Sequence, residues 1–562
     1  MSTAKRKLHI DEHAVPGTVF LVDLFNTATN APRSETEKDI LLVPAPSDDP
    51  EDPLNWSSIR KWRAVSLVHL YTFVVAWSSA GVYSILVEIS EATGLSVSQL
   101  NSGTGTMLLF FGWGCLLWQP WGLTYGRRGS YIVSLFLTAG ISVWTAYSTS
   151  YSTWVTQRVL IGLFGAPIEC LCEVSITDLY FNHQRGRQIG LYLLALSGGA
   201  YIAPLCNGFI SQNMGWQWVM YWCAILSGAT GILCFFFLEE TMYYRETTFE
   251  ATLDPDSVFN SSAPSETNAS SSSFNEKSLA NGTTTVPPVP DNTDDNILVT
   301  DFPERRSYLQ SLALWKVIPE RPNEFVRIIF RPFIVAAQLP IVLWSGCFQG
   351  VAVCAFSAMN ATASVVFSSE PYNFKSSMVG LTYIAPTIGC SIGAIWGGEI
   401  SDRFCIYLSR RNRGYREAEY RLWASIGLCI IPPSGMILWG VGTAHQVHWV
   451  GLVFGMGMLG FAMSTAGCIV IGYTIDSYKE ISGETMMSLN IIRCTIAFGF
   501  GYAITPWIDR AGYQNGFIEM AFISLALYLT FIFFLFKGKQ LRRNSASKYW
   551  KLVEHGIRSL QE

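Results

Sequence analysis

Charged residues are scarce in this chain of 562 residues, since Asp, Glu, Lys and Arg together make up 14% of it. Hydrophobic residues make up 50%, and the formal net charge is only −4. Several soluble domains of this total length would need more charged surface than the sequence supplies. The composition therefore excludes a string of soluble domains. It favours a membrane protein, with the lipid bilayer as a partner and no nucleic acid.

The sequence also lacks the patterns of a disulfide framework, a metal site or an active site. Its 13 cysteines include no CxxC pair, and its seven histidines are scattered. Cysteines that lie in apolar runs, as most of these do, are typically small core residues. No nucleophile–base set, metal cluster or phosphate-binding loop is recognisable. We therefore expect no enzyme activity, no metal and no cofactor.

Apolar runs long enough to cross a bilayer are abundant. They cover 64–88, 102–123, 131–149, 153–181, 187–211, 216–238, 332–356, 376–400, 421–441, 447–475, 485–508 and 514–536. These twelve runs form two groups of six. We therefore predict an all-α membrane protein with twelve transmembrane helices in two six-helix halves.

Polar segments divide the chain around the two groups of runs. We predict five parts: a cytosolic N-terminal tail at 1–63, a six-helix bundle at 64–238, a cytosolic linker at 239–331, a second six-helix bundle at 332–537 and a cytosolic C-terminal tail at 538–562. The linker is rich in Ser, Thr, Asn and Pro, which favours disorder. The N-terminal tail shows no signal-peptide core, so we expect the first helix to direct membrane insertion.

Basic residues mark one side of the predicted membrane. The loops after the second, fourth and eighth runs are rich in arginine, as at Arg127, Arg185 and Arg410. Because cytosolic loops are enriched in Lys and Arg, we predict that both termini are cytosolic. The basic segment 409–423 is expected to lie on the anionic inner leaflet, or to be a simple basic loop. Asn360, in the sequon NAT near the outer surface, is a candidate glycosylation site.

Ionisable residues inside the fourth apolar run are costly unless they face a polar interior. On a helix, Arg158, Glu169 and Glu173 share one face. Two carboxylates one turn apart repel each other when both are ionised, so we expect one of them to hold a proton. We predict that Glu169 and Glu173 couple protons to a cationic solute, with Arg158 as their outer partner. An ion pair that only fixes helix packing is the alternative.

Arg493 lies inside the eleventh run and could pair with a carboxylate or face the solute pathway. Aromatic and amide side chains of other runs could line that pathway, because aromatic rings bind organic cations. These candidates are Trp77, Tyr83, Trp113, Tyr192, Tyr201, Trp344, Gln349 and Tyr383. Filling a helix-packing core is the alternative for each of them.

A short internal repeat relates the two halves. GLTYGRRGS, which begins at Gly122, follows the second run, and GGEISDRF follows the eighth. Alignment of Gly122 with Gly398 places Arg127 on Arg403, next to Asp402. Two parallel halves of six helices are the organisation of major facilitator transporters.

On these residues the chain resembles the major facilitator superfamily, over about 60–540. The repeated loop looks like the family's motif A, which has a glycine, an acidic residue and a basic cluster. The first copy has Gly126 in place of the usual Asp but keeps Arg127 and Arg128, whereas the second keeps Asp402. The resemblance implies a role for both loops in gating.

Two further motifs carry the same resemblance. RVLIGLFGAPIE in the fourth run looks like motif B, whose arginine is Arg158 here. GAYIAPLCNG in the fifth run looks like motif C of drug:proton antiporters, with Gly199, Pro204 and Gly208. Glycine and proline at this spacing let helices approach closely and bend. Ordinary close packing is the alternative reading of motif C.

Longer blocks narrow the resemblance. DPLNWSSIRKW, APIECLCEVSITDLYFNHQRG, LEETMYYR and NRGYREAEYRL look like fungal drug:proton antiporters with twelve spans, in particular the Hol1-like transporters of organic cations and polyamines. The resemblance implies a monomeric carrier of small organic solutes and protons in the plasma membrane, or else in the vacuolar membrane. An efflux pump for drugs or for a fungal secondary metabolite is one alternative. A transceptor, which is a nutrient receptor on a transporter fold, is another.

Overall fold

The computed structural model describes residues 15–20, 49, 52–243, 313–315, 325–412 and 415–558. Most of the predicted linker at 239–331 and of the predicted N-terminal tail lies outside these residues. Unit 1, which comprises Met1–Tyr244 and Ser307–Glu562, contains all the elements given below.

Helices dominate the described residues, as the composition predicts. Those before the linker are α1 (Ser58–Ala80), α2 (Leu86–Thr93), α3 (Val97–Thr124), α4 (Arg127–Thr145), α5 (Tyr151–Gly165), α6 (Pro167–Leu179), α7 (Asn182–Met214) and α8 (Trp216–Phe237), with a short 3-10 helix, η1 (Pro53–Asn55), before α1.

The helices after the linker are α11 (Phe325–Gln338), α12 (Pro340–Ser368), α13 (Ser376–Thr382), α14 (Ile384–Ile395), α15 (Ser401–Arg411), α16 (Ile426–Ala444), α17 (Trp449–Ser477), α18 (Ser482–Leu529) and α19 (Phe531–Arg558). Shorter helical turns are η2 (Trp396–Ile400), η3 (Ala418–Ser425) and η4 (Lys479–Ile481). Two short strands, β1 (Thr18–Phe20) and β2 (Tyr415–Glu417), form an antiparallel pair.

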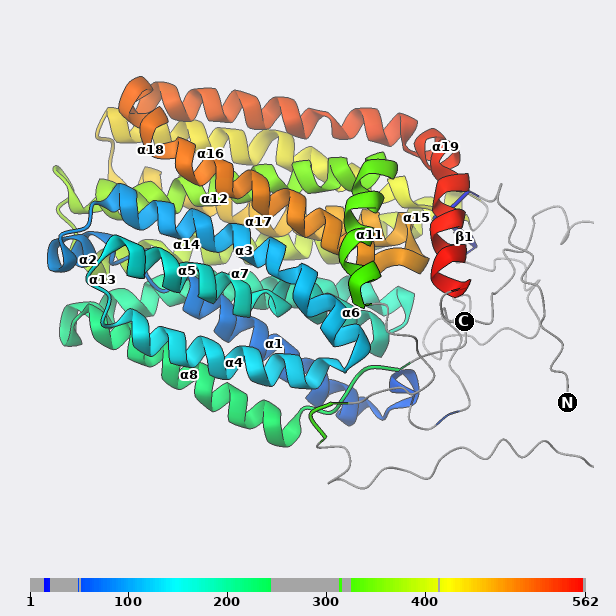
Figure 1. The fold of residues 1–562 in the computed structure, drawn as a ribbon. Helices are drawn as coiled ribbons and strands as arrows, with labels where there is room; N and C mark the ends of the chain where they lie inside the picture. The colour runs from blue at the N-terminus through cyan, green and yellow to red at the C-terminus, as the bar shows by residue number, and fades with distance from the viewer. Residues whose placement is uncertain are drawn as a thin grey trace, which may run out of the picture. The chain divides into compact units, whose positions relative to one another are not determined.

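The long helices run side by side (Figure 1). Within the first group α1 packs on α7, α3 on α5 and α4 on α8; within the second, α12 and α16 pack on α18 and α14 packs on α17. The two groups meet where α3 lies against α18 and where α7 lies against α13 and α14. Glycines bring these surfaces close: a Cβ atom on Gly112 of α3 would lie 2.6 Å from Cβ of Cys494 on α18.

In the described part of the chain, eight helical segments are long and apolar enough to cross a membrane. They are Tyr151–Leu179, Arg187–Met214, Trp216–Phe237, Pro340–Ser368, Ser376–Arg411, Ala418–Ala444, Trp449–Ser477 and Lys479–Glu554. The last contains a reversal at Gly512, whose φ of 75° and ψ of 169° are not helical. Glycine reaches this backbone conformation without the steric cost that a side chain brings. This reversal falls between the predicted runs 485–508 and 514–536.

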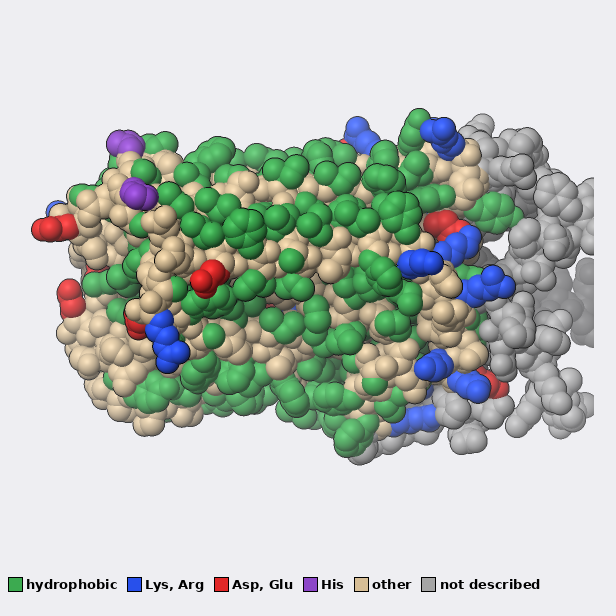
Figure 2. Space-filling model, turned by 90° about the horizontal axis from the view of Figure 1, so that it is seen from above, with side chains coloured by type: hydrophobic (Ala, Val, Ile, Leu, Met, Phe, Trp, Pro, Cys, Tyr) green, Lys and Arg blue, Asp and Glu red, His purple; other side chains and the backbone are tan. Residues whose placement is uncertain are grey.

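Basic side chains gather at one end of these helices. Figure 2 shows Lys and Arg mainly at the end where α15 and α19 lie, with hydrophobic side chains along the length between the two ends. This is the distribution that the sequence predicts for a cytosolic end.

Several helices begin or end away from the predicted boundaries. α11 overlaps the end of the predicted linker and the start of the seventh predicted run at 332. The long helix of that run, α12, begins only at Pro340, because the backbone of Leu339 is extended. The predicted C-terminal tail at 538–562 continues α19 as far as Arg558. The predicted N-terminal tail at 1–63 contributes β1 and the start of α1. Short polar elements of this kind carry little periodic signal.

Candidate functional site

The fourth predicted span is built from two consecutive helices, α5 and α6. α6 begins at Pro167, because proline lacks the N–H of a helix interior but fits the first helical turn. Together α5 and α6 form one apolar segment. Glu169 and Glu173 both lie in α6, one turn apart, whereas Arg158 lies in α5.

Glu169 is ion-paired with Arg493, which reaches it from α18 in the second group of helices. The two side chains are 13% and 4% exposed, respectively. The side-chain amide of Asn490, also on α18, donates to the backbone carbonyl of Glu169. α6 and α18 are therefore connected by one ion pair and one hydrogen bond. We call Glu169, Glu173, Asn490 and Arg493 the charge site.

Glu173 is 2% exposed, and its Oε2 atom has no hydrogen-bond partner in the structure. Arg493 lies near enough to interact electrostatically with both Glu173 and Tyr192. Tyr192, on α7, donates a hydrogen bond of 2.8 Å to the carbonyl of Ile168. A buried polar atom without a partner is unfavourable, so Glu173 is suited to exchange a proton or to meet a solute. Of the predicted residues, the structure therefore brings Glu169, Glu173, Tyr192 and Arg493 together.

Arg158 lies apart from the charge site. Its guanidinium carbon is 4.4 Å from the ring centroid of Trp154, and the side chain is 1% exposed. Its Nε and Nη2 atoms have no hydrogen-bond partner. Tyr83 and Cys223 lie near enough to interact with it electrostatically. The predicted partnership between Arg158 and the two glutamates thus has no direct contact in this conformation.

Three predicted tyrosines gather around α12 instead. Rings of Tyr83 and Tyr201 lie edge-on to Phe356, with centroid distances of 6.0 and 5.4 Å. Tyr383 donates a hydrogen bond of 2.9 Å to Oδ1 of Asn360. Because Tyr83 and Tyr201 belong to the first group of helices and Phe356 to the second, this aromatic cluster also joins the two groups.

A small cavity of about 20 Å³ adjoins the aromatic cluster, and it has room for about one water molecule. Tyr83, Asn101 and Asn360 are among the residues that line it. Asn360 is 1% exposed and lies within α12, with its Nδ2 atom unpaired. A glycan needs an accessible side chain. The candidate glycosylation of Asn360 is therefore not compatible with this conformation.

The remaining predicted pathway residues lie in different surroundings. Trp77 packs in a core between α1, α7 and α8. Trp113 is 42% exposed and donates to a threonine of α18. Trp344 stacks on Phe534, with centroids 4.2 Å apart. Gln349 and Trp77 are both buried, and each has a polar atom without a hydrogen-bond partner, Oε1 and Nε1 respectively.

The first copy of the repeated loop, a predicted gating motif, is held by buried charges. Arg127 is 4% exposed and forms an ion pair of 2.7 Å with Asp178 at the end of α6. Arg128 is 1% exposed and donates to the backbone carbonyl of Ala313 over 2.9 Å. A Cβ atom on Gly122 would lie 2.6 Å from a methyl group of Leu171 on α6, so a side chain at this position would require that leucine to move.

The second copy of the loop differs from the first in a way that the repeat alone does not predict. Gly398 lies in η2, and Asp402 forms an ion pair of 2.7 Å with Arg421. The aligned residue Arg403, in α15, is 77% exposed and pairs with Glu399, one turn earlier in η2. The buried counterpart of Arg127 is therefore Arg421. Sequence alignment missed it because Arg421 enters from the next helical segment, eighteen positions further along.

The motif C residues of α7 pack against two different partners. A Cβ atom on Gly199 would lie 2.8 Å from Cβ of Ala76 on α1. A Cβ atom on Gly380 of α13 would lie 2.8 Å from the carbonyl oxygen of Pro204, and Gly208 also faces α13 closely. Gly199 thus packs within the first group of helices, whereas Pro204 and Gly208 form part of the contact between the groups.

We expect Gly199→Ala to lower the midpoint of thermal unfolding in detergent, because overpacking costs about 1–3 kcal/mol. Gly198→Ala is the matched control, since the nearest atom to a Cβ there is 3.8 Å away. Equal unfolding midpoints for the two variants would contradict the close α1–α7 contact.

The described residues contain no group of three or more His, Cys, Asp or Glu that could hold a metal ion. All 13 cysteines are free thiols. The chemistry available at the charge site is therefore that of carboxylates, a guanidinium and an amide.

Comparison with known proteins is consistent with this architecture. A family model for the Major Facilitator Superfamily matches residues 68–501. The chain is 31% identical to an MFS-type transporter of Schizosaccharomyces pombe, over 96% of this chain and 94% of that protein. It is 28% identical to the protein HOL1 of Saccharomyces cerevisiae, over 93% of each chain.

Among solved structures, the proton:xylose symporter XylE has a TM-score of 0.55 and 15% sequence identity, and the match covers 85% of this chain and 97% of that one. At this identity the similarity supports the fold alone. The family match, which extends over most of the chain, together with the similarity to the fission-yeast transporter, confirms the predicted membership: this chain belongs to the Major Facilitator Superfamily.

Proposed function

We propose that the chain is a proton-coupled secondary transporter of small organic cations, which works by alternating access across the plasma membrane. The observation that carries the proposal is the ion pair between Glu169 and Arg493, because it joins the two groups of helices inside the apolar part of the fold. An alternating-access carrier must make and break such contacts as its halves rock about a central site.

Twelve membrane passes are part of this proposal. The apolar segment Lys479–Glu554 accounts for two passes, separated at Gly512, and the other seven apolar segments account for one each. α1, α3 and α4 are helices of 23, 28 and 19 residues, which supply the remaining three. At 1.5 Å per residue, even the shortest has a length of about 28 Å, close to the bilayer's hydrocarbon thickness. The basic end of the helices is then cytosolic, with both termini on that side.

The charge site suggests how a proton is coupled to the conformational change. Protonation of Glu169 would remove its charge and weaken its attraction to Arg493, which would let α6 separate from α18. Glu173, with an unpaired Oε2, could take the same proton or a cationic group of the solute. Binding of a cation and of a proton would then be mutually exclusive, which is the requirement for exchange.

The proposed class of solute is supported by the charges in the interior and by the resemblance of the sequence to known transporters. Two carboxylates in the interior favour a positively charged solute. The Hol1-like sequence blocks favour organic cations and polyamines. Export is the second candidate, because motif C resembles that of drug:proton antiporters and the curated relatives include an efflux pump, radE, of Floropilus chiversii (23% identical) and an MFS antiporter, QDR3, of Candida albicans (24% identical).

A solute panel tests this proposal. Cells that express the protein, and matched cells that do not, would be compared for accumulation of labelled polyamines, monovalent organic cations and organic anions. We expect protein-dependent movement of cations and no movement of anions. Lower accumulation in the expressing cells would indicate export, and protein-dependent movement of anions alone would contradict the proposed substrate class.

A further inference from the structure

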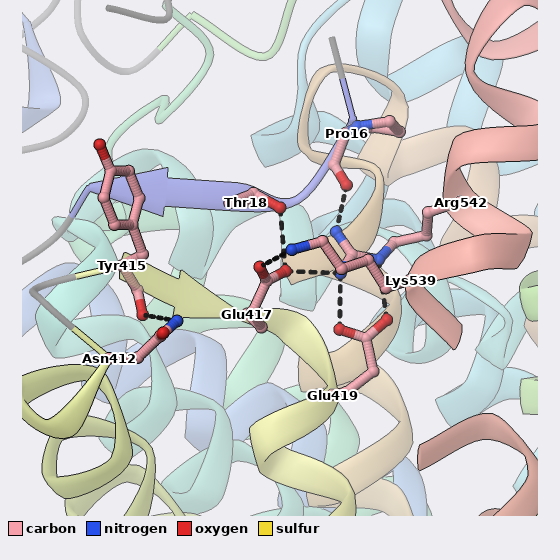
Figure 3. Close-up of polar contacts among 8 residues, drawn as sticks. All are labelled: Pro16, Thr18, Asn412, Tyr415, Glu417, Glu419, Lys539 and Arg542. Atoms are coloured by element: carbon pink, nitrogen blue, oxygen red, sulfur yellow. Dashed lines mark hydrogen bonds and ion pairs between the residues drawn. The ribbon is translucent and has the colours of Figure 1, made fainter. Parts of the chain in front are cut away.

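The N-terminal segment of the chain docks on the second group of helices at their basic end. β1 pairs antiparallel with β2, so that Thr18 faces Glu417, Val19 faces Arg416 and Phe20 faces Tyr415. The Thr18 hydroxyl also donates a hydrogen bond of 2.9 Å to the Glu417 carboxylate (Figure 3). The two strands are almost 400 residues apart in sequence, which requires a specific site to bring them together.

Arg542 of α19 lies at the centre of that site and is completely buried. Its guanidinium donates to both carboxylate oxygens of Glu419, over 2.9 and 2.5 Å, and to Oε2 of Glu417 over 2.9 Å. Its Nη1 atom donates to the backbone carbonyl of Pro16. The N-terminal segment thus supplies a hydrogen-bond acceptor to a donor of this buried guanidinium.

Gly17 fits the segment into this site. Its φ of +81° is unfavourable for residues with a side chain. A Cβ atom there would lie 2.7 Å from the backbone carbonyl oxygen of Asp476 and 2.9 Å from Nη1 of Arg542. Position 17 therefore accepts only glycine in the docked conformation, both for its backbone and for its close approach to the end of α17.

The same site stabilises the charges of the second gating loop. Asp476, whose carbonyl faces Gly17, forms an ion pair of 2.6 Å with Arg416 of β2 and one of 3.4 Å with Arg421. Arg421 in turn pairs with Asp402 of α15. The N-terminal segment, the loop before α16 and the ends of α17 and α19 are therefore connected by one continuous set of polar contacts.

Glu417 is ionised in this set. Burial opposes its ionisation, but hydrogen bonds from Lys539 and Arg542 outweigh burial and lower the pKa of this carboxyl group below its ordinary value. Its contribution to stability is therefore present near neutral pH and is lost as the pH falls through the lowered value. The sequence predicted that 409–423 lies on the inner leaflet or forms a simple basic loop. Within this segment the structure shows a strand and a helical turn with buried charges.

We propose that β2 and the ends of α17 and α19 form a peptide-binding groove that takes one extended strand, supplied in cis by residues 15–20. Recognition combines strand pairing with a carbonyl that caps a buried arginine, which is a form of β-strand addition. All contacts described above lie in the second group of helices, so the segment can stay bound while the two halves move. Its role is to hold the cytosolic ends of α15, α17 and α19 together. Any effect of this segment on the transport rate rests on the proposed function. The docking of the segment itself does not depend on that function.

A cross-strand disulfide tests docking in the full chain. Phe20→Cys with Tyr415→Cys places two thiols at directly paired positions. A protease site inserted between residues 21 and 48 then releases an N-terminal fragment unless the disulfide holds it. We expect the fragment to stay attached without reductant, and to be released from the control pair Phe20→Cys with Trp62→Cys. Release from both pairs would overturn the docked strand.

The effect of docking is tested by displacing or fixing the segment. We expect Gly17→Ala to lower the cross-link yield by about fivefold or more, as loss of one buried hydrogen bond implies. It should also lower the transport rate, whereas Gly94→Ala, a glycine with φ +73 and open space around it, should leave both unchanged. The disulfide-fixed protein should transport normally. Abolished transport after fixing would show that the segment must detach, and would overturn the proposed role even where the solute panel succeeds.

Discussion

Glu169→Gln is expected to lower proton-coupled transport by about 100-fold or more while the protein still folds and reaches the membrane. Glutamine cannot ionise, so it can neither release a proton nor attract Arg493 strongly. The substitution also leaves Arg493 without its buried counter-charge, at a cost of about 3–5 kcal/mol in folding stability, so rates must be compared per amount of folded protein. Initial rates of substrate movement in vesicles, normalised to the amount of protein, measure the effect.

Two matched variants show whether charge, and not shape, is responsible. Glu91→Gln removes a carboxylate from an exposed position and should leave transport unchanged. Exchange of the two charges, with Glu169→Arg and Arg493→Glu together, should restore part of the folding stability lost in either single variant. Normal proton-driven transport by Glu169→Gln would exclude Glu169 from the mechanism and leave a packing role for the ion pair.

Glu173→Gln is expected to abolish proton-driven accumulation of the solute while leaving solute exchange across the membrane intact. The Oε2 atom of Glu173 has no hydrogen-bond partner, so an amide at this position breaks no hydrogen bond of that atom but removes the electrostatic interaction with Arg493. Glu169 and Arg493 keep their ion pair, and the protein should still exchange labelled for unlabelled solute. Accumulation against a gradient should fall to the background level, because one carboxylate can no longer take up a proton. Measurement of exchange and of accumulation on the same vesicles distinguishes the two activities. Parallel loss of both would instead indicate a binding or structural role for Glu173.

The sequence identified the three charged members of the charge site, but neither Asn490 nor the contacts among the four residues. Charged residues in an apolar run are conspicuous, so Glu169, Glu173 and Arg493 were all identifiable. The pairing of Glu169 with Arg493 joins residues 324 positions apart, and no local pattern encodes that contact. It depends on how α6 packs on α18 in three dimensions. The separation of Arg158 from both glutamates has the same origin, because helical periodicity fixes a shared face but not what covers each part of it.

The predicted ends of the chain were less accurate than its membrane segments. Twelve apolar runs are strong signals, and most of them coincide with observed helices. Strands of three residues, such as β1 and β2, have no comparable signal, and β1 forms only because β2 and Arg542 are already in place. Arg421 was overlooked for a related reason: the loop repeat aligned Arg403 with Arg127, although burial in the fold selects Arg421.

A proton gradient is expected to drive solute movement through the charge site. The purified protein would be reconstituted into lipid vesicles with a cation accepted in the solute panel, and the initial flux would be measured with an imposed pH gradient and after its collapse by a protonophore. We predict that the gradient drives accumulation, that collapse abolishes it, and that Glu173→Gln behaves like collapse. A flux of equal size with and without the gradient would contradict proton coupling.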